Sequence, residues 1–178
     1  MRCAGAGSSR SLVGSPTCRP RRSTPFDDRA ALHWLRTDVY LADTSAWIWS
    51  RRHAYPELRK WFDDELVAGN IATCDIVKLE LLYGTRSAAE HRQRRDELDA
   101  LVTLPIGRAE WTRAIDVQDL LAQLGANHQK VARPPDLLVA AAAETSGVEV
   151  LHYDTDFDWI ERVTGQPMRR LAAAGSLA

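Results

Sequence analysis

The chain contains 178 residues, of which 45% are hydrophobic, and it carries a formal net charge of −1. This length allows one domain with a substantial core and is too short for two full domains. No run of about eighteen apolar residues occurs, so a membrane-spanning helix is excluded. The three cysteines, Cys3, Cys18 and Cys74, form no close pair, which argues against a disulfide framework or a cysteine zinc site and favours the reducing cytoplasm.

The small net charge conceals an asymmetry along the chain. Residues 1–38 contain seven arginines and three aspartates, whereas the remaining residues contain 16 basic and 21 acidic side chains. A protein that grips nucleic acid through a broad basic face normally shows this in its overall charge. Any nucleic-acid function of this chain must therefore rest on local basic patches or on bound cations.

Residues 1–37 are rich in Gly, Ser, Pro and Arg and lack sustained hydrophobic periodicity. We expect this segment to be disordered and the folded domain to span residues 38–178. No continuous apolar stretch follows the arginines, which argues against a secretory signal. An alternative interpretation is that translation begins further in, near Val39.

From Val39 onward, short apolar runs alternate with helical stretches, a pattern typical of β-α units around a parallel sheet. In this part of the chain we expect strands at 39–42 and 70–74, and helices at 46–52, 56–68 and 75–83. Pro56 separates the first two helices. Asp75 is suited to cap the third helix, and Gly84 to end it.

The second half of the chain continues the same alternation. We expect strands at 101–104 and 148–153, and helices at 87–100, 108–124 and 136–145. A polar loop at 127–135 precedes the last of these helices, which Gly147 closes. After Asp154 we expect one more turn of helix and a short tail. The sequence therefore predicts an α/β domain with a mainly parallel sheet.

Two acidic residues follow predicted strands directly, and a third opens a helix. In open parallel sheets, ligands bind beyond the carboxyl ends of the strands, and Asp43 and Asp154 fall at such ends. Asp136 follows Pro134 and Pro135, so its backbone is pinned and its carboxylate lies near the positive end of a helix.

A fourth acid, Glu80, lies in the middle of a predicted helix. Helical spacing brings it close to the buried stripe that Ile76, Val77 and Tyr83 imply. An acid in such apolar company needs a structural or functional reason, because burial of an unpaired charge is costly.

Each acid also has an ordinary structural explanation. Asp43 would begin the turn Asp-Thr-Ser, Asp136 would be a first-turn helix acid, and Glu80 would reach solvent from a helix edge. Asp154 and Asp156 would be turn and capping residues. Taken together the acids are harder to explain in this way, because several buried like charges repel unless a cation neutralises them.

Ligands that are all oxygen suit Mg²⁺ or Mn²⁺. Such an ion lowers the pKa of a bound water and stabilises the charge that develops on a phosphate, which is the chemistry of metal-dependent nucleases. The acids therefore predict a divalent metal site.

Four segments, in this order and at this spacing, resemble the PIN domain and, within it, the VapC toxins of VapBC toxin–antitoxin systems. The segments are Leu-Ala-Asp43-Thr-Ser45, Leu-Glu80-Leu-Leu-Tyr-Gly, Pro-Pro-Asp136-Leu-Leu-Val-Ala-Ala-Ala-Ala-Glu and His-Tyr-Asp154-Thr-Asp156-Phe. The resemblance extends from about Val39 to the C-terminus. It implies a three-layer fold with a central, mainly parallel sheet flanked by helices, and an endoribonuclease that acts as the toxin of a type II pair.

The resemblance also implies which residues form the site. Asp43, Glu80, Asp136 and either Asp154 or Asp156 would hold one or two Mg²⁺ ions, with Mn²⁺ as a substitute. We favour Asp154 over Asp156, because Asp154 follows its strand immediately whereas Asp156 is better suited to cap the next turn.

Two hydroxyl residues, Ser45 and Thr44, would hydrogen-bond the carboxylates and the substrate phosphate. A metal-activated water would attack the phosphodiester, so that no protein nucleophile is required. The implied partners are an RNA substrate, a VapB-like antitoxin and a second copy of the chain.

Basic and aromatic residues near the predicted site have two interpretations. Lys130, Arg133 and Arg51 would grip RNA phosphates or belong to solvated loops. Trp47 and Trp49 would stack bases or pack against a partner helix, with at most one of them in the core. We expect three further tryptophans to lie in the core, namely Trp61, Trp111 and Trp159.

Two other functions fit parts of the pattern. A magnesium-dependent phosphatase would use Asp43 as its nucleophile, but that chemistry requires a second acid two residues on, where Ser45 stands. A PIN-like module that only binds its partners usually lacks one or more of the acids, and all four positions are filled here.

Overall fold

A computed structural model describes residues 39–178 of the chain. The expectations for residues 1–37, and for Cys3 and Cys18, lie outside the described residues. The strands are β1 (Tyr40–Ala42), β2 (Ile71–Cys74), β3 (Val102–Leu104), β4 (Glu149–His152) and β5 (Met168–Arg170). They form one sheet in the order β3-β2-β1-β4-β5, and every neighbouring pair is parallel.

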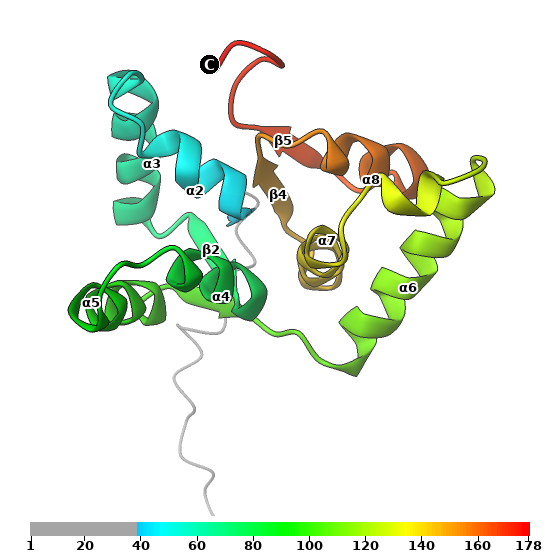
Figure 1. Cartoon of the computed structure of the whole chain (residues 1–178), viewed down its shortest axis with the longest axis horizontal. Coiled ribbons are helices and arrows are strands. Elements are labelled where there is room, and N and C mark those ends of the chain that lie inside the picture. The colour runs from blue at the N-terminus through cyan, green and yellow to red at the C-terminus, as the bar shows by residue number, and fades with distance from the viewer. Residues whose placement is uncertain (1–38) are drawn as a thin grey trace, which may run out of the picture.

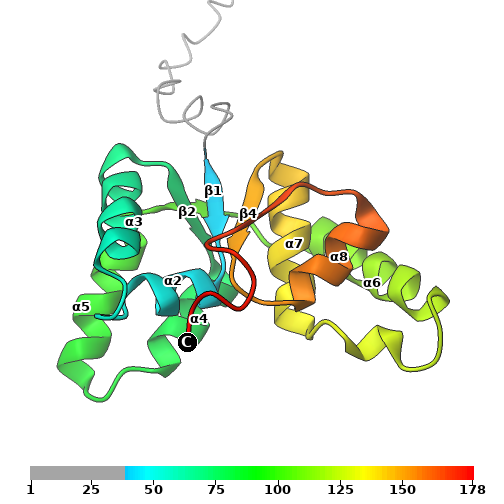
Figure 2. The same ribbon diagram turned by 90° about the horizontal axis from the view of Figure 1, so that it is seen from above.

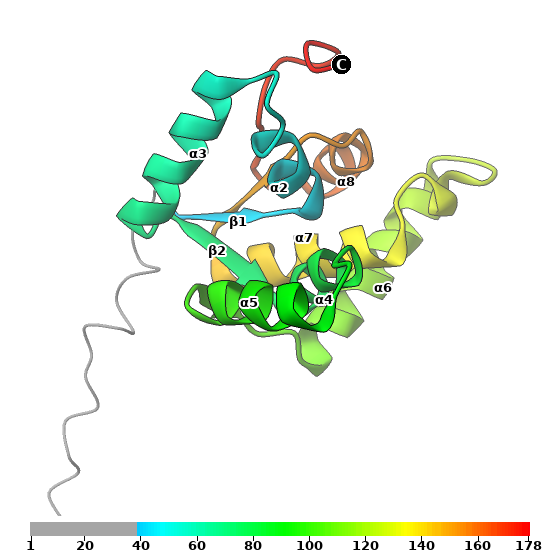
Figure 3. The ribbon, with the colours of Figure 1, turned by 60° about the vertical axis from the view of Figure 1, so that its left-hand side comes forward.

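The helices cover both faces of this sheet (Figure 1 and Figure 3). They are α2 (Thr44–Ser50), α3 (Pro56–Ala68), α4 (Asp75–Tyr83), α5 (Ala88–Asp99), α6 (Arg108–Gln123), α7 (Pro134–Ser146) and α8 (Asp156–Thr164). In Figure 3, α2, α3 and α8 lie above the strands, while α4, α5 and α7 lie below them. This arrangement confirms the predicted three-layer α/β fold with a parallel sheet.

The sheet forms where the sequence is apolar on both faces of the strand. All four residues of β2 and three of the four in β4 are buried, as is usual for parallel strands covered by helices on each side. Helices α3 and α7 end at Gly69 and Gly147, whose φ angles are 74° and 68°. This left-handed conformation favours glycine, so both helices stop where the sequence indicates.

Helix α7 is the central helix of the lower layer. Its residues from Asp136 to Ala143 are all buried, and it contacts α4, α6, α8, β3 and β4. Four consecutive alanines from Ala140 to Ala143 add little side-chain bulk, so the backbone of α7 can approach its neighbours closely at normal packing density. The carboxylate of Asp136 is thereby held at a fixed position.

The C-terminal part of the domain differs from the sequence-based prediction. Helix α8 has nine residues instead of a single turn, and the expected tail contains β5. The β5 strand escaped prediction because it is only three residues long and contains Arg169 and Arg170. Charged residues are tolerated on an edge strand, and the pairing of β5 with β4 depends on tertiary contacts.

Several aromatic side chains also depart from expectation. Trp111 is exposed, so its predicted core position is wrong, whereas Trp61 and Trp159 pack partly against the core. Trp47 is buried against Phe62, with ring centroids 5.0 Å apart. Tyr83 is also exposed, so it does not belong to the buried stripe that was expected beside Glu80.

The predicted loop at 127–135 contains a short 3₁₀ turn, η2 (His128–Lys130), and α7 already begins at Pro134. None of the helices in the described part of the chain is long and apolar enough to span a bilayer.

Candidate active site

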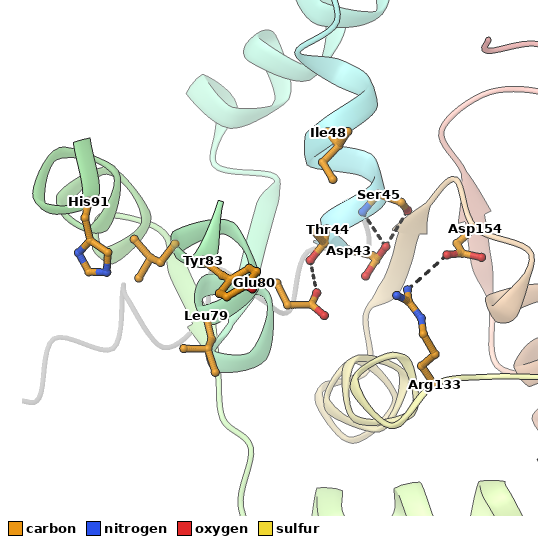
Figure 4. A pocket seen from close by; sticks show the side chains of 11 residues that line it. Asp43, Thr44, Ser45, Ile48, Leu79, Glu80, Tyr83, His91, Arg133 and Asp154 are labelled. Carbon is orange, nitrogen blue, oxygen red and sulfur yellow. Dashed lines mark hydrogen bonds and ion pairs between the residues drawn. The ribbon is translucent and has the colours of Figure 1, made fainter. Parts of the chain in front are cut away.

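An open cavity of about 850 Å³ lies at the carboxyl edge of the sheet, where β1 leads into α2 and β4 ends. Figure 2 shows α2 and α4 next to this edge, with α7 on its other side. The acids that line the cavity are Asp43, Glu80 and Asp154, and the remaining wall includes Thr44, Ser45, Ile48, Leu79, Tyr83, His91 and Arg133 (Figure 4). The topology therefore brings acids from distant parts of the sequence to one edge.

Asp43 joins the end of β1 to the start of α2. Its Oδ2 atom accepts hydrogen bonds from the Ser45 backbone N (2.8 Å) and from Ser45 Oγ (2.6 Å), so it caps the helix as the turn interpretation predicted. Ser45 Oγ in turn accepts from the backbone N of Tyr153 at 2.9 Å, which connects Asp43 to the end of β4. Only 3% of Asp43 is exposed, and this burial raises the pKa of its carboxyl group above the usual value.

Glu80 reaches the same cavity from α4. Its Oε2 atom accepts a hydrogen bond of 2.5 Å from Thr44 Oγ1, which links α4 to the first residue of α2. The negative charge of Glu80 contributes, after burial, to raising the pKa of Asp43. Ser45 and Thr44 therefore contact carboxylates as predicted, each hydroxyl with a different acid.

Asp136 lies in the first turn of α7. Its Oδ2 atom accepts from the backbone N of Arg133 at 3.2 Å, so the interpretation as a first-turn helix acid is also correct. Asp136 is only 2% exposed. Its pKa is raised to about 7, mainly by burial and also by the nearby Asp43 and Asp156, while Arg133 opposes the increase.

Of the two acids after β4, Asp154 lines the cavity and, contrary to expectation, also makes the turn hydrogen bond. The Oδ1 atom of Asp154 accepts a hydrogen bond from the backbone N of Asp156 at 3.1 Å, so Asp154 is the residue that caps the turn. Asp156 was expected to be the cap, and that expectation is wrong. The Asp156 carboxyl contacts the guanidinium of Arg133 instead, with its Oδ2 atom 3.7 Å from Nε.

Arg133 is the cation of this cluster. Its Nε atom lies 3.1 Å from Asp136 Oδ2 and 3.7 Å from Asp156 Oδ2. Its Nη2 atom lies 3.5 Å from Asp154 Oδ2, the pair drawn in Figure 4. These three acids raise the pKa of the guanidinium, with Asp136 as the largest influence.

The acids fit a hard divalent cation by their chemistry. Two of them, Asp43 and Asp136, are buried with raised pKa values, so their negative charge is incompletely compensated, and every donor is a carboxylate oxygen. Within residues 39–178, no three acidic, histidine or cysteine side chains are close enough together to enclose a metal ion. The guanidinium of Arg133 lies among the carboxylates instead.

The other basic residues expected to bind RNA lie further away. Arg51 pairs with Asp63 at 2.6 Å and lines a smaller neighbouring cavity of about 250 Å³ that also includes Glu80. Lys130 is exposed on η2 and does not line the main cavity. Only Arg133 of the three is at the acidic edge.

Sequence reasoning missed the apolar wall of the cavity. Leu79 and Tyr83 on α4 are 67% and 93% exposed, and Ile48 on α2 is also exposed. The available signal is the pair Leu79 and Tyr83, which lies one helical turn apart on either side of Glu80; of the two, Tyr83 was expected in the buried stripe. His91 also lines the cavity and was not singled out.

A parallel α/β domain whose carboxyl edge gathers acids from β1, α4, α7 and the end of β4 is the arrangement of a PIN-type domain. The chain belongs to the PIN-domain family and, within it, groups with the VapC ribonucleases. The family model for the PIN domain matches residues 40–163.

The relatives of this chain include two ribonucleases of Mycobacterium tuberculosis. Ribonuclease VapC18 is 40% identical over 139 residues, which cover 78% of this chain and 99% of that protein. Ribonuclease VapC51 is 38% identical over 138 residues, which cover 78% of this chain and 96% of that protein.

Solved structures share the fold at low identity. The VapBC2 complex of Rickettsia felis bound to a promoter DNA fragment matches with a TM-score of 0.55 and 21% identity, over 74% of this chain and 98% of that chain. The DNA-bound VapBC complex of Salmonella typhimurium matches with a TM-score of 0.58 and 18% identity, over 75% and 98% of the two chains. These likenesses support the parallel fold independently of the sequence relatives.

The raised pKa of Asp136 predicts that the metal-free protein loses stability as the pH rises. An acid whose folded-state pKa exceeds its unfolded value stabilises the fold fully below the unfolded pKa, and this contribution is lost as the pH rises through the folded pKa. For Asp136 the window runs from 3.8 to about 7. Asp136→Asn should therefore make the loss of stability with rising pH smaller and should raise the melting temperature at pH 8. Thermal melts in EDTA at several pH values measure both effects.

Asp119→Asn is the matched control, because Asp119 is an exposed acid on α6 away from the cavity. It should leave the dependence of melting temperature on pH unchanged. A lower melting temperature for Asp136→Asn than for the wild type at pH 8 would contradict the assignment of repulsion to this site.

Proposed function

We propose that this protein is the toxin of a type II toxin–antitoxin pair and acts as a Mg²⁺-dependent endoribonuclease. The observation that carries the proposal is the convergence of five acids at the carboxyl edge of a parallel sheet in a member of the VapC group, namely Asp43, Glu80, Asp136, Asp154 and Asp156. The relatives are named ribonucleases, which supports RNA as the substrate. We assign the domain to residues 38–178 and its site of action to the cytoplasm.

The carboxylates would hold the metal, and the surrounding groups would keep them in position. Mg²⁺ bound there would lower the pKa of a water molecule and stabilise the charge that develops on the phosphate. Asp43 is oriented by Ser45, and Glu80 by Thr44, through the hydrogen bonds that these hydroxyls donate. Mn²⁺ has similar ligand preferences and should replace Mg²⁺.

Two features disfavour the alternative functions. An aspartyl phosphatase needs a second acid two residues after its nucleophile, and at that position the Ser45 hydroxyl donates to Asp43. A module that only binds partners has no need to keep Asp43 and Asp136 buried as acids with raised pKa values, since buried carboxylates cost stability.

The antitoxin partner would dock on the apolar wall of the cavity. Several solved relatives are complexes of VapB and VapC proteins, and Leu79, Tyr83 and Ile48 offer exposed apolar surface beside the acids. An apolar helix would bury this surface, and a cation on it would satisfy the carboxylates. Trp47, which the sequence suggested as part of this surface, is buried and does not contribute. We also expect a homodimer, as the family resemblance implies.

The proposed activity predicts RNA cleavage that requires a divalent metal. Purified protein should cleave RNA in Mg²⁺ or Mn²⁺ and lose this activity in excess EDTA, and Asp43→Asn should reduce the rate at least about a hundredfold, as loss of a positioned catalytic group does. Gel analysis of total RNA, with mapping of the cleaved ends, measures both effects. Cleavage that persists undiminished in EDTA would rule out the mechanism.

We expect Asp154 and Asp156, the two acids after β4, to have different roles, one in the turn and one in catalysis. Asp156→Asn should cut the cleavage rate at least about a hundredfold, because its carboxyl shares the guanidinium of Arg133 with Asp136. Asp154→Asn should keep most of the activity, since an amide oxygen still accepts the turn hydrogen bond. Asp154→Ala should lower the free energy of unfolding by about 1 kcal/mol, as lost caps do. Rates at saturating Mg²⁺ and denaturant melts decide this, and the reverse pattern would transfer the metal role to Asp154.

The apolar wall predicts where antitoxin binding is sensitive to mutation. Tyr83→Ala and Leu79→Ala should each weaken binding of the cognate VapB-like antitoxin by about tenfold or more, as truncation of central interface residues commonly does. Isothermal titration calorimetry measures the affinities. Val67→Ala is the control, because Val67 is highly exposed on α3 but does not line the cavity. Equal affinities for all three variants would exclude this wall as the interface.

A further inference from the structure

Arg133 makes more ionic contacts than any other basic side chain in the described part of the chain. It lies within 4 Å of three different carboxylates, those of Asp136, Asp154 and Asp156. Each other basic side chain that forms an ion pair in this part of the chain contacts a single acid, as Arg51 contacts Asp63 and Lys60 contacts Asp64. One guanidinium therefore serves a whole cluster of acids.

The position of Arg133 explains how several acids can lie close together at the carboxyl edge of the sheet despite their like charges. Asp136 is almost fully buried, and both it and Asp156 lie close to the Nε atom of Arg133, at 3.1 Å and 3.7 Å. Buried like charges require a cation close by, and within residues 39–178 the cluster obtains that cation from the residue that immediately precedes α7.

A metal ion and the guanidinium would need the same carboxylate oxygens. The Oδ2 atom of Asp136 already accepts from both the backbone N and Nε of Arg133. A divalent ion that used Asp136 together with Asp156 would add two positive charges beside the positive charge of Arg133. At a few ångströms, that repulsion is large even with strong dielectric screening.

We infer that Arg133 is a built-in counter-ion that neutralises Asp136, Asp154 and Asp156 in the metal-free protein and competes with a divalent ion for them. This inference rests on the proposed metal-dependent function. When metal binds, the guanidinium leaves the cluster. The acids are then charge-balanced in both states, and the affinity for metal is set partly by the strength of the ion pairs that Arg133 gives up.

The local structure allows this exchange without unfolding. The Arg133 side chain is 63% exposed, so it can turn into solvent or toward a bound phosphate. Its backbone N still donates to Asp136 Oδ2 and holds the start of α7. Only the side chain has to move, because Pro134 and Pro135 keep the backbone of the first turn in place.

The test is a direct measurement of metal binding to the full-length protein. Isothermal titration calorimetry with Mn²⁺, at pH 8 so that protons do not compete for the carboxylates, should give binding to Arg133→Gln that is roughly five- to tenfold tighter than to the wild type, as expected when charge-assisted hydrogen bonds no longer compete. The melting temperature of Arg133→Gln in EDTA should be lower than that of the wild type. Its increase on addition of Mn²⁺ should be larger.

Two further variants separate competition from a general charge effect. Arg51→Gln removes the same charge beside the neighbouring cavity but breaks a pair with Asp63, so Mn²⁺ affinity should change less than about twofold. Arg133→Lys keeps the charge but loses the guanidinium fork, and its affinity should lie between those of the wild type and Arg133→Gln.

Three results would overturn the inference. Arg133→Gln that binds Mn²⁺ no more tightly than the wild type would identify Arg133 as an organiser of the site, not a competitor. Equal tightening in Arg51→Gln and Arg133→Gln would reduce the effect to long-range charge. Absence of Mn²⁺ binding in the wild type and in every variant would refute the metal site itself, and with it the proposed function.

Discussion

The rest of this structure depends on one constraint, the repulsion among carboxylates that are buried side by side at the carboxyl edge of the sheet. Asp43 and Asp136 are almost fully buried, and neighbouring acids raise the electrostatic cost of ionising them: Glu80 for Asp43, and Asp43 with Asp156 for Asp136. The fold meets this cost with polar partners. Ser45 donates to Asp43, Thr44 donates to Glu80, and Arg133 lies among the acids that α7 and the end of β4 contribute.

The topology decides which acids meet. Because β1 lies between β2 and β4 and all strands are parallel, the ends of β1 and β4 open on the same edge. At that edge Asp43 caps the N-terminus of α2, and Asp136 lies in the first turn of α7. Both carboxylates therefore lie near helix N-termini, where partial positive charge favours anions. An alanine-rich α7, buried in the lower layer, gives the second of these positions its rigidity.

The same edge combines two surfaces that a toxin needs. Acids from several elements form a site suited to a divalent ion and a phosphate, while Leu79 and Tyr83 extend an exposed apolar wall from the helix that carries Glu80. A partner that covers the apolar wall necessarily approaches the acids. Inhibition of catalysis and burial of apolar surface would then occur in a single binding event.

The sequence by itself determined the fold class, four of the five strands and the candidate acids. Apolar runs and helix-ending glycines are local signals, and Asp43, Glu80 and Asp136 stand in segments whose pattern could be read without coordinates. Only the tertiary structure decided that Arg133 contacts three acids, that Asp154 caps its turn while Asp156 contacts Arg133, and that Tyr83 is exposed. It also revealed β5, whose three residues gain their pairing from β4. The physical reason is that periodicity reports which residues are apolar, whereas the direction of a side chain at a helix end or a strand edge depends on neighbours that are distant in sequence.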